Sequence, residues 1–161
     1  MVYRVRQAGR EDFAVVLGFH RDLYVDFRQS VVPADEVILG EYRDLETVLA
    51  EDVRAMLAAD RARVYLAEDQ DGPCGYISGR VQDEERRVLR RRGVVEDWYV
   101  NPTRRGQGVG KELFEVLKAW FMSRGCEVIE SSSWPANRAS RAIHEGLGFR
   151  EVEIKYRCRL T

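Results

Sequence analysis

Arg104-Arg105-Gly106-Gln107-Gly108-Val109-Gly110-Lys111 lies between an extended run that ends at Val100 and a long helical pattern that begins near Gly108. Three glycines in five residues allow the backbone to adopt positive φ and to approach a ligand closely. The free N–H groups at the start of the following helix point into the loop and carry the partial positive charge of the helix dipole. Because two arginines and a lysine flank the same turn, the stretch predicts a binding site for a phosphate or pyrophosphate.

Glycine spacing separates the known phosphate loops from one another. A Walker loop needs four residues before its Gly-Lys-Ser/Thr, whereas Gly106 and Gly110 have three between them and Glu112 replaces the hydroxyl residue. A Gly-x-Gly-x-x-Gly dinucleotide fingerprint is one residue too long for this loop and normally opens a first βαβ unit. The remaining interpretations are a loop of another family and a plain glycine-rich turn with solvated arginines.

Length and composition predict a single domain over residues 1–161. The chain has 26 Lys and Arg against 27 Asp and Glu, so it lacks the overall charge that recruits nucleic acid or an anionic membrane. No apolar run approaches the roughly 18 residues of a spanning helix, and no signal peptide core is present, so we expect a cytoplasmic protein. Cys74, Cys126 and Cys158 have neither CxxC nor His-rich context, which favours buried thiols and no metal site.

Hydrophobic periodicity predicts an α/β (α+β) fold with a mixed, mostly antiparallel central sheet flanked by helices. The Asp71-Gly72 dipeptide predicts a hairpin, and the helical crossover after Val100 predicts a parallel strand pair. Asp44 is a candidate N-cap, and we expect Ala139, Ala142, Ile143 and Leu147 to face inward on the last helix. The expected strands cover residues 2–6, 63–68, 74–81, 94–100, 126–131 and 149–160, and the expected helices residues 13–27, 45–57, 109–124 and 138–147.

The predicted central strand over residues 94–100 carries two adjacent carboxylates, Glu96 and Asp97. Strict alternation puts Glu96 with Trp98 and Val100 on one face and Asp97 with Tyr99 on the other. Burial of an unpaired charge is costly, so each carboxylate must be paired, hydrated or functional.

Two motifs in order resemble the GNAT superfamily of acyl-CoA-dependent N-acyltransferases. Arg105-x-x-Gly108-x-Gly110 resembles the family pattern Gln/Arg-x-x-Gly-x-Gly/Ala, and Asn137-x-x-Ser140-x-x-x-His144-Glu145-x-Leu147-Gly148-Phe149 resembles the second signature, in which a tyrosine stands where this chain has His144. The resemblance covers residues 94–149. It implies the acyl-CoA N-acyltransferase fold, acetyl-CoA as the acyl donor and no metal.

The resemblance also implies where the coenzyme binds. Backbone groups of the strand end would bond the pantetheine amides, the glycine loop would hold the pyrophosphate, and the start of the last helix would steady the pantetheine arm from the other side. The implied coenzyme-binding residues are Trp98, Tyr99, Val100, Arg104, Arg105, Gly106, Gln107, Gly108, Val109, Gly110, Lys111, Asn137 and Ser140.

Three residues are candidates for proton transfer. We expect Glu96 to act as the base on the amine through an ordered water, the alternative being a carboxylate paired with a neighbouring arginine. Asp97 is the second candidate and could bind the substrate ammonium. His144 shares a helix face with Asn137 and could protonate the departing thiolate in place of the family's tyrosine. A purely structural histidine is the alternative, with Tyr99 or water as the proton donor.

The expected acceptor is a primary amine of a small molecule. The run from Glu96 to Val100 is similar to the diamine (polyamine) acetyltransferase branch, so a polyamine or diamine is one candidate. A protein acetyltransferase acting on an N-terminus or lysine is a second interpretation, and a non-catalytic acyl-CoA-binding domain a third. His20 is read as a hydrogen-bonded histidine at the core edge, with a catalytic role as the alternative. The acids Glu46, Glu51 and Asp52 are read as a solvated helix face or an attractor of a cationic substrate. We expect a monomer or homodimer with no nucleic-acid or membrane partner.

Overall fold

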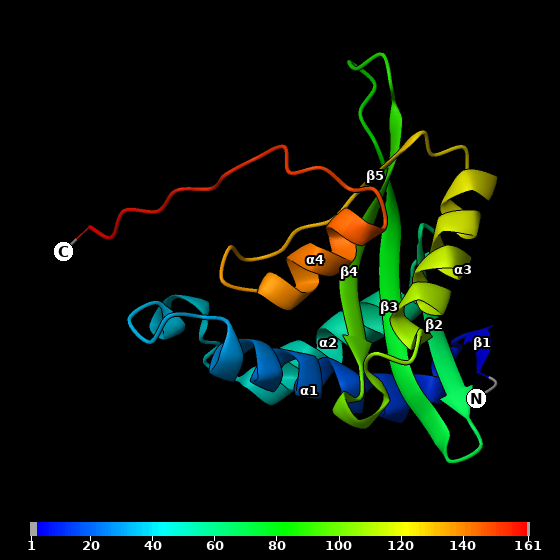
Figure 1. Cartoon of the computed structure of the whole chain (residues 1–161), viewed down its shortest axis with the longest axis horizontal. Coiled ribbons are helices and arrows are strands. Elements are labelled where there is room, and N and C mark those ends of the chain that lie inside the picture. The colour runs from blue at the N-terminus through cyan, green and yellow to red at the C-terminus, as the bar shows by residue number, and fades with distance from the viewer. Residues whose placement is uncertain (1–2, 161) are drawn as a thin grey trace.

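A computed structural model describes residues 3–160 and arranges five strands in the order β1-β2-β3-β4-β5 (Figure 1). Neighbouring strands are antiparallel except for the parallel pair β4 and β5. The mixed, mostly antiparallel sheet predicted from the sequence is therefore confirmed. The strands are β1 (Arg4–Gln7), β2 (Ala62–Asp69), β3 (Gly72–Asp83), β4 (Arg91–Val100) and β5 (Val128–Glu130).

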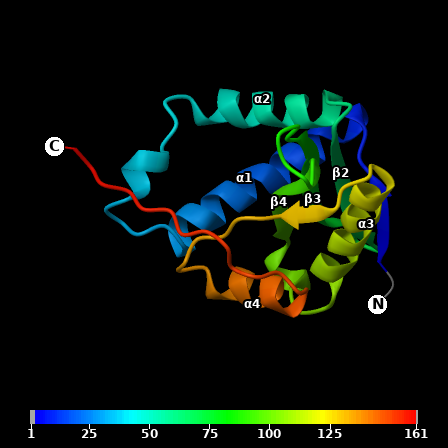
Figure 2. The same cartoon turned by 90° about the horizontal axis from the view of Figure 1, so that it is seen from above.

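Helices cover both faces of this sheet, as Figure 2 shows from above. The first two, α1 (Phe13–Ser30) and α2 (Leu45–Ala58), pack on one face, and α3 (Val109–Ser123) packs on the other. The last helix, α4 (Arg138–Gly146), follows β5. Three short 3₁₀ segments complete the set: η1 (Arg10–Asp12), η2 (Val37–Gly40) and η3 (Pro102–Arg104).

Alternation along β3 divides its side chains between the two cores. Tyr76 points toward α1, where its ring stacks on Phe19 with centroids 6.0 Å apart. Ile77 points the other way and joins Leu117 and Phe121 of α3. The strand is thus buried on both faces, which makes it a rigid support for β4 beside it.

Several local signals in the sequence are confirmed. The Asp44 carboxylate caps α2 by accepting the Thr47 N–H at 3.2 Å, and the Asp71-Gly72 turn joins β2 to β3. Gly125, at φ +75°, follows the end of α3. The first strand is observed from Arg4, and Val2, predicted as its start, lies outside the described residues.

The predicted strand over residues 149–160 is wrong, because none of these residues is in a strand. Its alternating apolar side chains are exposed, including Val152, Tyr156 and Leu160. A strand needs a neighbour to satisfy its backbone, and this segment extends away from the sheet instead of pairing with it (Figure 1).

Two smaller expectations fail near the same end of the chain. Ile143 is 51% exposed and Ala139 and Ala142 are exposed, because the segment that follows α4 does not return to cover its apolar side. The expected buried thiol holds for Cys74, whereas Cys126 is only partly buried and Cys158 is exposed on the extended segment.

A β-bulge interrupts the pairing of β3 with β4. Ser78 faces Asp97 while Gly79 faces Val95, so Glu96 is an extra residue on β4. Strict alternation is therefore wrong at Glu96, which lies with Asp97 on the side covered by α1 and α2. A Cβ at Gly79 would lie 2.7 Å from the Phe121 ring, so this position suits only glycine.

The parallel pairing of β4 with β5 stops just before the bulge. It joins three residue pairs, the last of which is Val94 with Glu130. From Val95 to Val100, β4 therefore has β3 on one side and no strand on the other within the described residues. Beyond the Val94–Glu130 pair, β4 continues without β5 to Val100, where the chain enters the glycine loop that precedes α3.

Candidate active site

The glycine loop presents free backbone donors at the start of α3. Gly106 and Gly108 have φ of +75° and +90°, and a Cβ at either would meet no atom within 4 Å. The first hydrogen bond into the helix runs from Glu112 N–H to the Gly108 carbonyl at 3.1 Å. The N–H groups of residues 108–111 therefore have no partner within the helix, and they lie at the positive end of the helix dipole. Such an arrangement fits a pyrophosphate.

The side chains of the loop are mostly engaged elsewhere. The Arg104 guanidinium bonds Asp69 and Asp71 of the β2–β3 turn, each at 2.6 Å, and so points away from the loop. Gln107 bonds Tyr3 and Thr103. The part of this stretch left for the predicted anion is therefore its backbone more than these two side chains.

Two basic side chains of the stretch remain near the separation of β4 and β5. Arg105 donates to the Val100 carbonyl at 2.9 Å and to Asp26 of α1 at 2.6 Å, and it stays half exposed. Lys111 is exposed and forms no ion pair with another described residue. Arg105 ties the end of β4 to α1, and Lys111 is available to a ligand.

Trp98 forms the wall between β4 and α3. Its ring stacks on Phe114 with centroids 5.5 Å apart, and a Cβ at Gly110 would lie 3.3 Å from its Nε1. Val109 is fully buried and fixes the first turn of the helix against the sheet. Tyr99 points to the opposite side and is buried, which leaves its backbone as the part able to reach a ligand beside β4.

Glu96 is paired with Arg80, a partner that the sequence suggested only as an unnamed neighbouring arginine. Arg80 Nε lies 2.5 Å from Glu96 Oε1, and one third of the Glu96 side chain stays exposed. Partial burial raises the pKa of the Glu96 carboxyl, and the Arg80 charge opposes that rise. The result is a carboxylate that is held in place and still open to solvent.

Asp97 lies deeper and belongs to a hydrogen-bonded group. Its Oδ2 accepts from the Ser78 hydroxyl at 2.9 Å and lies 3.7 Å from His20 Nδ1. The same imidazole nitrogen is 3.0 Å from the Tyr76 hydroxyl, which confirms His20 as a hydrogen-bonded residue at the core edge. Burial raises the pKa of Asp97, and the His20 charge and Ser78 bond counteract it.

Asp52 of α2 extends this group toward solvent. Its Oδ2 lies 3.8 Å from His20 Nε2, and half of its side chain is exposed. Its charge also raises the pKa of both Glu96 and Asp97. Three carboxylates thus gather on one side of the β4 bulge, a field that favours a cationic group.

Both ring nitrogens of His144 form hydrogen bonds within the protein. Nδ1 donates to the Ser140 carbonyl at 2.7 Å, which leaves Nε2 as the acceptor for the Ser131 hydroxyl at 2.8 Å. The ring edge meets Trp98, with centroids 5.9 Å apart. His144 therefore lies on the Trp98 side of β4, opposite the carboxylates.

Asn137 begins α4 by capping it. Its Oδ1 accepts the Ser140 N–H at 3.0 Å, so the amide oxygen is used and the amide nitrogen remains for a ligand. The Ser140 hydroxyl lies 3.4 Å from His144 Nδ1. The second motif therefore shapes the helix end that carries His144.

The fold brings most of the predicted site residues to the separation of β4 and β5, and it adds partners that sequence patterns did not identify. Arg80, Ser78 and Tyr76 reach the site only through the strand register of β3, for which no local signal exists. Ser131 follows β5 in a run of three serines, and nothing in that run marks it as the partner of His144.

Neither a metal site nor a membrane-spanning helix is present among the described residues. Among residues 3–160, no group of three or more His, Cys, Asp or Glu side chains is placed to hold a metal ion. Within the same residues, no helix has the length and apolarity needed to cross a membrane.

Comparison with known proteins identifies a family. Residues 21–149 match the family model described as the acetyltransferase (GNAT) family. Over 133 residues, the chain is 30% identical to aminoglycoside N(6')-acetyltransferase type 1 of Stenotrophomonas maltophilia, covering 78% of this chain and 86% of that protein. The protein of the same name from Salmonella typhimurium is 30% identical over 112 residues, covering 67% of this chain and 77% of that protein.

Solved structures show the same fold at low identity. An aminoglycoside N-acetyltransferase, AAC(6')-Iy in complex with CoA, has a TM-score of 0.77 and 22% identity, with 99% of this chain and 96% of that chain covered. An acetyltransferase with acetyl-CoA from Clostridium acetobutylicum has a TM-score of 0.78 and 16% identity, with 98% and 96% covered.

Proposed function

This chain belongs to the GNAT family of acetyltransferases, and we propose that it acetylates a primary amine of a small polycationic molecule, an aminoglycoside being the first candidate. It is an acetyl-CoA-dependent N-acetyltransferase that acts on amines. Acetyl-CoA supplies an activated acetyl thioester, and the chain supplies the binding site, the orientation and the proton transfers.

Donor binding rests on the backbone of the glycine loop. The N–H groups of residues 108–111 hold the pyrophosphate, helped by the exposed Lys111. The unpaired edge of β4 from Val95 to Val100 offers backbone groups to the pantetheine amides, and the Asn137 amide nitrogen faces the same arm from α4. Trp98 excludes water from one side of this channel.

One observation carries the acceptor assignment: the β4 bulge puts Glu96 beside Asp97 on the same face, where Asp52 adds a third carboxylate. This charge favours an acceptor that arrives as an ammonium ion and carries further positive groups. The curated relatives are named for aminoglycosides, which supports an aminosugar over a simple diamine.

Glu96 is the base in this proposal. An alkylamine is protonated at neutral pH, so a carboxylate removes its proton through an ordered water. The raised pKa of Glu96 brings the carboxylate closer to this task. Asp97 holds the ammonium and is not itself the base, because it is buried and already bonded to Ser78.

Acetyl transfer forms a C–N bond and breaks the C–S bond, so the leaving thiolate needs a proton. In this proposal His144 acts as its imidazolium: Nδ1–H keeps its bond to the Ser140 carbonyl, and Nε2–H, oriented by the Ser131 oxygen, is the proton passed to the thiolate, which leaves the neutral ring with Nε2 as an acceptor. This replaces the tyrosine of the family pattern.

An acceptor panel tests the function. Thiol release from acetyl-CoA is measured with neamine, with 1,5-diaminopentane and with a lysine-containing peptide. We expect the highest kcat/KM with neamine. Preference for the diamine would support the polyamine interpretation, preference for the peptide would support a protein acetyltransferase, and coenzyme binding without thiol release under any acceptor would contradict the proposal.

A further inference from the structure

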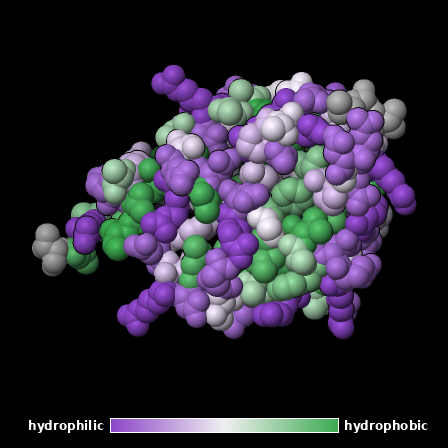
Figure 3. Space-filling view, turned by 90° about the horizontal axis from the view of Figure 1, so that it is seen from below, coloured by the Kyte–Doolittle hydropathy of each residue, from purple (hydrophilic) through white to green (hydrophobic). Residues whose placement is uncertain are grey.

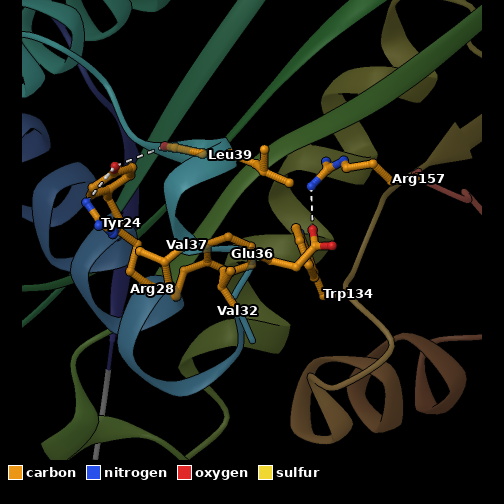
Figure 4. Close-up of a pocket in the computed structure, with 10 residues that line it drawn as sticks. Tyr24, Arg28, Val32, Glu36, Val37, Leu39, Trp134 and Arg157 are labelled. Atoms are coloured by element: carbon orange, nitrogen blue, oxygen red, sulfur yellow. Dashed lines mark hydrogen bonds and ion pairs between the residues drawn. The ribbon is translucent and has the colours of Figure 1, made fainter. Parts of the chain in front are cut away.

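A small cavity lies between the end of α1, the segment after it and the chain that follows β5. It has a volume of about 60 Å³, and its walls include Tyr24 and Phe27 of α1, Val37 and Leu39 of the following segment, and Trp134 (Figure 4). The Phe27 and Trp134 rings meet edge to face with centroids 5.5 Å apart. At this cavity, aromatic side chains of α1 thus meet Trp134 of the segment between β5 and α4.

A cationic side chain of the protein itself, Arg157, lines this cavity. Arg157 Nη1 lies 2.6 Å from Glu36 Oε2, and its guanidinium lies over the Trp134 ring, 5.9 Å from the centroid (Figure 4). A carboxylate on one side and an aromatic face on the other form a site for a cation. The second arginine at the cavity, Arg28, is neutralised by Glu41 at 3.2 Å.

Arg157 comes from a segment that has little else to hold it. Residues 150–160 form no helix or strand, and their apolar side chains are exposed. Figure 3 shows apolar surface near this end of the molecule, bordered by hydrophilic residues. Among residues 3–160, the hydrogen bonds, ion pairs and cation–π contacts that join residues 150–160 to other parts of the chain are those of Glu151 with Arg141 and those of Arg157. An exposed ion pair of this kind stabilises little, so a bound ligand can displace it.

The cavity and His20, which contacts the Asp97 carboxylate, lie along the same helix, α1. His20 is one helical turn before Tyr24 and two before Phe27, about 6 and about 10 Å along the α1 axis. A ligand that places one ammonium group at the β4 carboxylates and another at Glu36 must therefore span about 10 Å or more along α1.

We propose that Glu36 and Trp134 form a second cation subsite of the acceptor site, which Arg157 of the chain's own C-terminal segment fills until a polycationic acceptor displaces it. The subsite rests on the proposed function only in that the acceptor is cationic. It selects acceptors with more than one positive group, and it makes Arg157 an internal competitor of the substrate.

Removal of Glu36 and removal of Arg157 are then expected to change the preference for a polycationic acceptor in opposite directions. The probes are neamine, which carries several ammonium groups, and cyclohexylmethylamine, which carries one aminomethyl group on a six-membered ring. Glu36→Gln removes the attraction, so the ratio of KM for neamine to KM for cyclohexylmethylamine should rise about tenfold. Arg157→Ala removes the competitor, so the same ratio should fall about threefold. Asp35→Asn and Arg159→Ala, which change neighbouring charges without touching the pair, are the controls.

A purely structural ion pair gives another result. In that case both substitutions would change the KM ratio in the same direction or leave it unchanged, and either outcome would overturn the subsite. The opposite signs also make the test independent of a general loss of stability, which lowers activity toward both amines together.

Equilibrium binding separates this inference from the proposed function. Calorimetric titration of neamine into each variant in the presence of CoA measures the subsite without turnover. If neamine is not acetylated but binds with the same opposite pattern, the subsite stands and the aminoglycoside acetyltransferase proposal fails. If neamine does not bind the wild-type chain, the subsite is overturned.

Discussion

The Nε atom of Arg80 lies 2.5 Å from Oε1 of Glu96, across the strand pair that the β4 bulge distorts. This ion pair lowers the pKa of Glu96 against the rise caused by burial. The same contact that holds the carboxylate in place therefore also sets the pH at which it can act as a base.

Arg80→Met should shift the acid limb of the pH profile of kcat/KM to higher pH. Without the guanidinium charge the pKa of Glu96 rises further, so a higher pH is needed to deprotonate it. Arg90→Met, at the exposed hairpin tip, is the matched control and should leave the limb in place. An identical limb in wild type and Arg80→Met would remove Glu96 as the base.

Glu96→Gln should lower kcat by about 10²- to 10⁴-fold, the usual range for loss of a general base. The affinity for CoA, measured by calorimetry, should change little because the glycine loop is intact. Glu115→Gln, a surface acid on α3, serves as the control. Full turnover by Glu96→Gln at saturating amine would contradict the role assigned here.

Gly108→Val should weaken CoA binding at least about tenfold. Gly108 has φ of +90°, which a β-branched residue adopts only with strain, and its N–H is one of the donors at the start of α3. Gly146→Ala, at the end of α4 and without positive φ, should bind CoA normally. Equal calorimetric affinities for the two variants would argue against the loop as the pyrophosphate site.

His144→Phe should lower kcat by about 100-fold while CoA affinity changes little. Ser131→Ala should lower kcat less, since it removes only the hydroxyl that orients Nε2. Ser132→Ala, on an exposed neighbour, provides the baseline. A pH–rate profile that is the same for wild type and His144→Phe would exclude His144 from proton transfer.

Asp83 links stability to pH at the base of the β3–β4 hairpin. Hydrogen bonds from Arg91 and Arg61 lower its pKa from the usual 3.8 to about 2. Because the folded value is the lower one, the stabilisation is fully present above pH 3.8 and is lost as pH falls toward 2. Asp83→Asn should therefore be less stable than wild type at pH 7, with a difference that shrinks as pH falls from about 4 to about 2.

Urea unfolding across that range checks the prediction, with Asp60→Asn as an exposed acidic control. A difference between Asp83→Asn and wild type that stays constant with pH would show that the two ion pairs contribute nothing specific.

The parts of the site that depend on local sequence could be predicted. Positive φ at Gly106 and Gly108 and the helix that follows them arise within a few residues, so short patterns identify them. The parallel pair of β4 and β5 follows from one helical crossover between two apolar runs.

The parts of the site that depend on contacts between residues far apart in the sequence could not be predicted. The bulge at Glu96 is set by the register of β3 against β4 and by Phe121 packing on Gly79, which no pattern in residues 94–100 reveals. His20 meets Asp97 across 77 positions of sequence for the same kind of reason. Alternation over residues 149–160 predicted a strand, but alternation describes side chains and does not provide the neighbouring strand that pairing needs.

A crystal structure of the chain with CoA and neamine tests the central claim most directly. We predict the pyrophosphate on the N–H groups of residues 108–111 and a primary amino group of neamine bonded to Glu96 directly or through one water, with Asp97 beside it. An amine bound away from both carboxylates of β4, with the glycine loop empty or contacting another part of the coenzyme, would contradict the account.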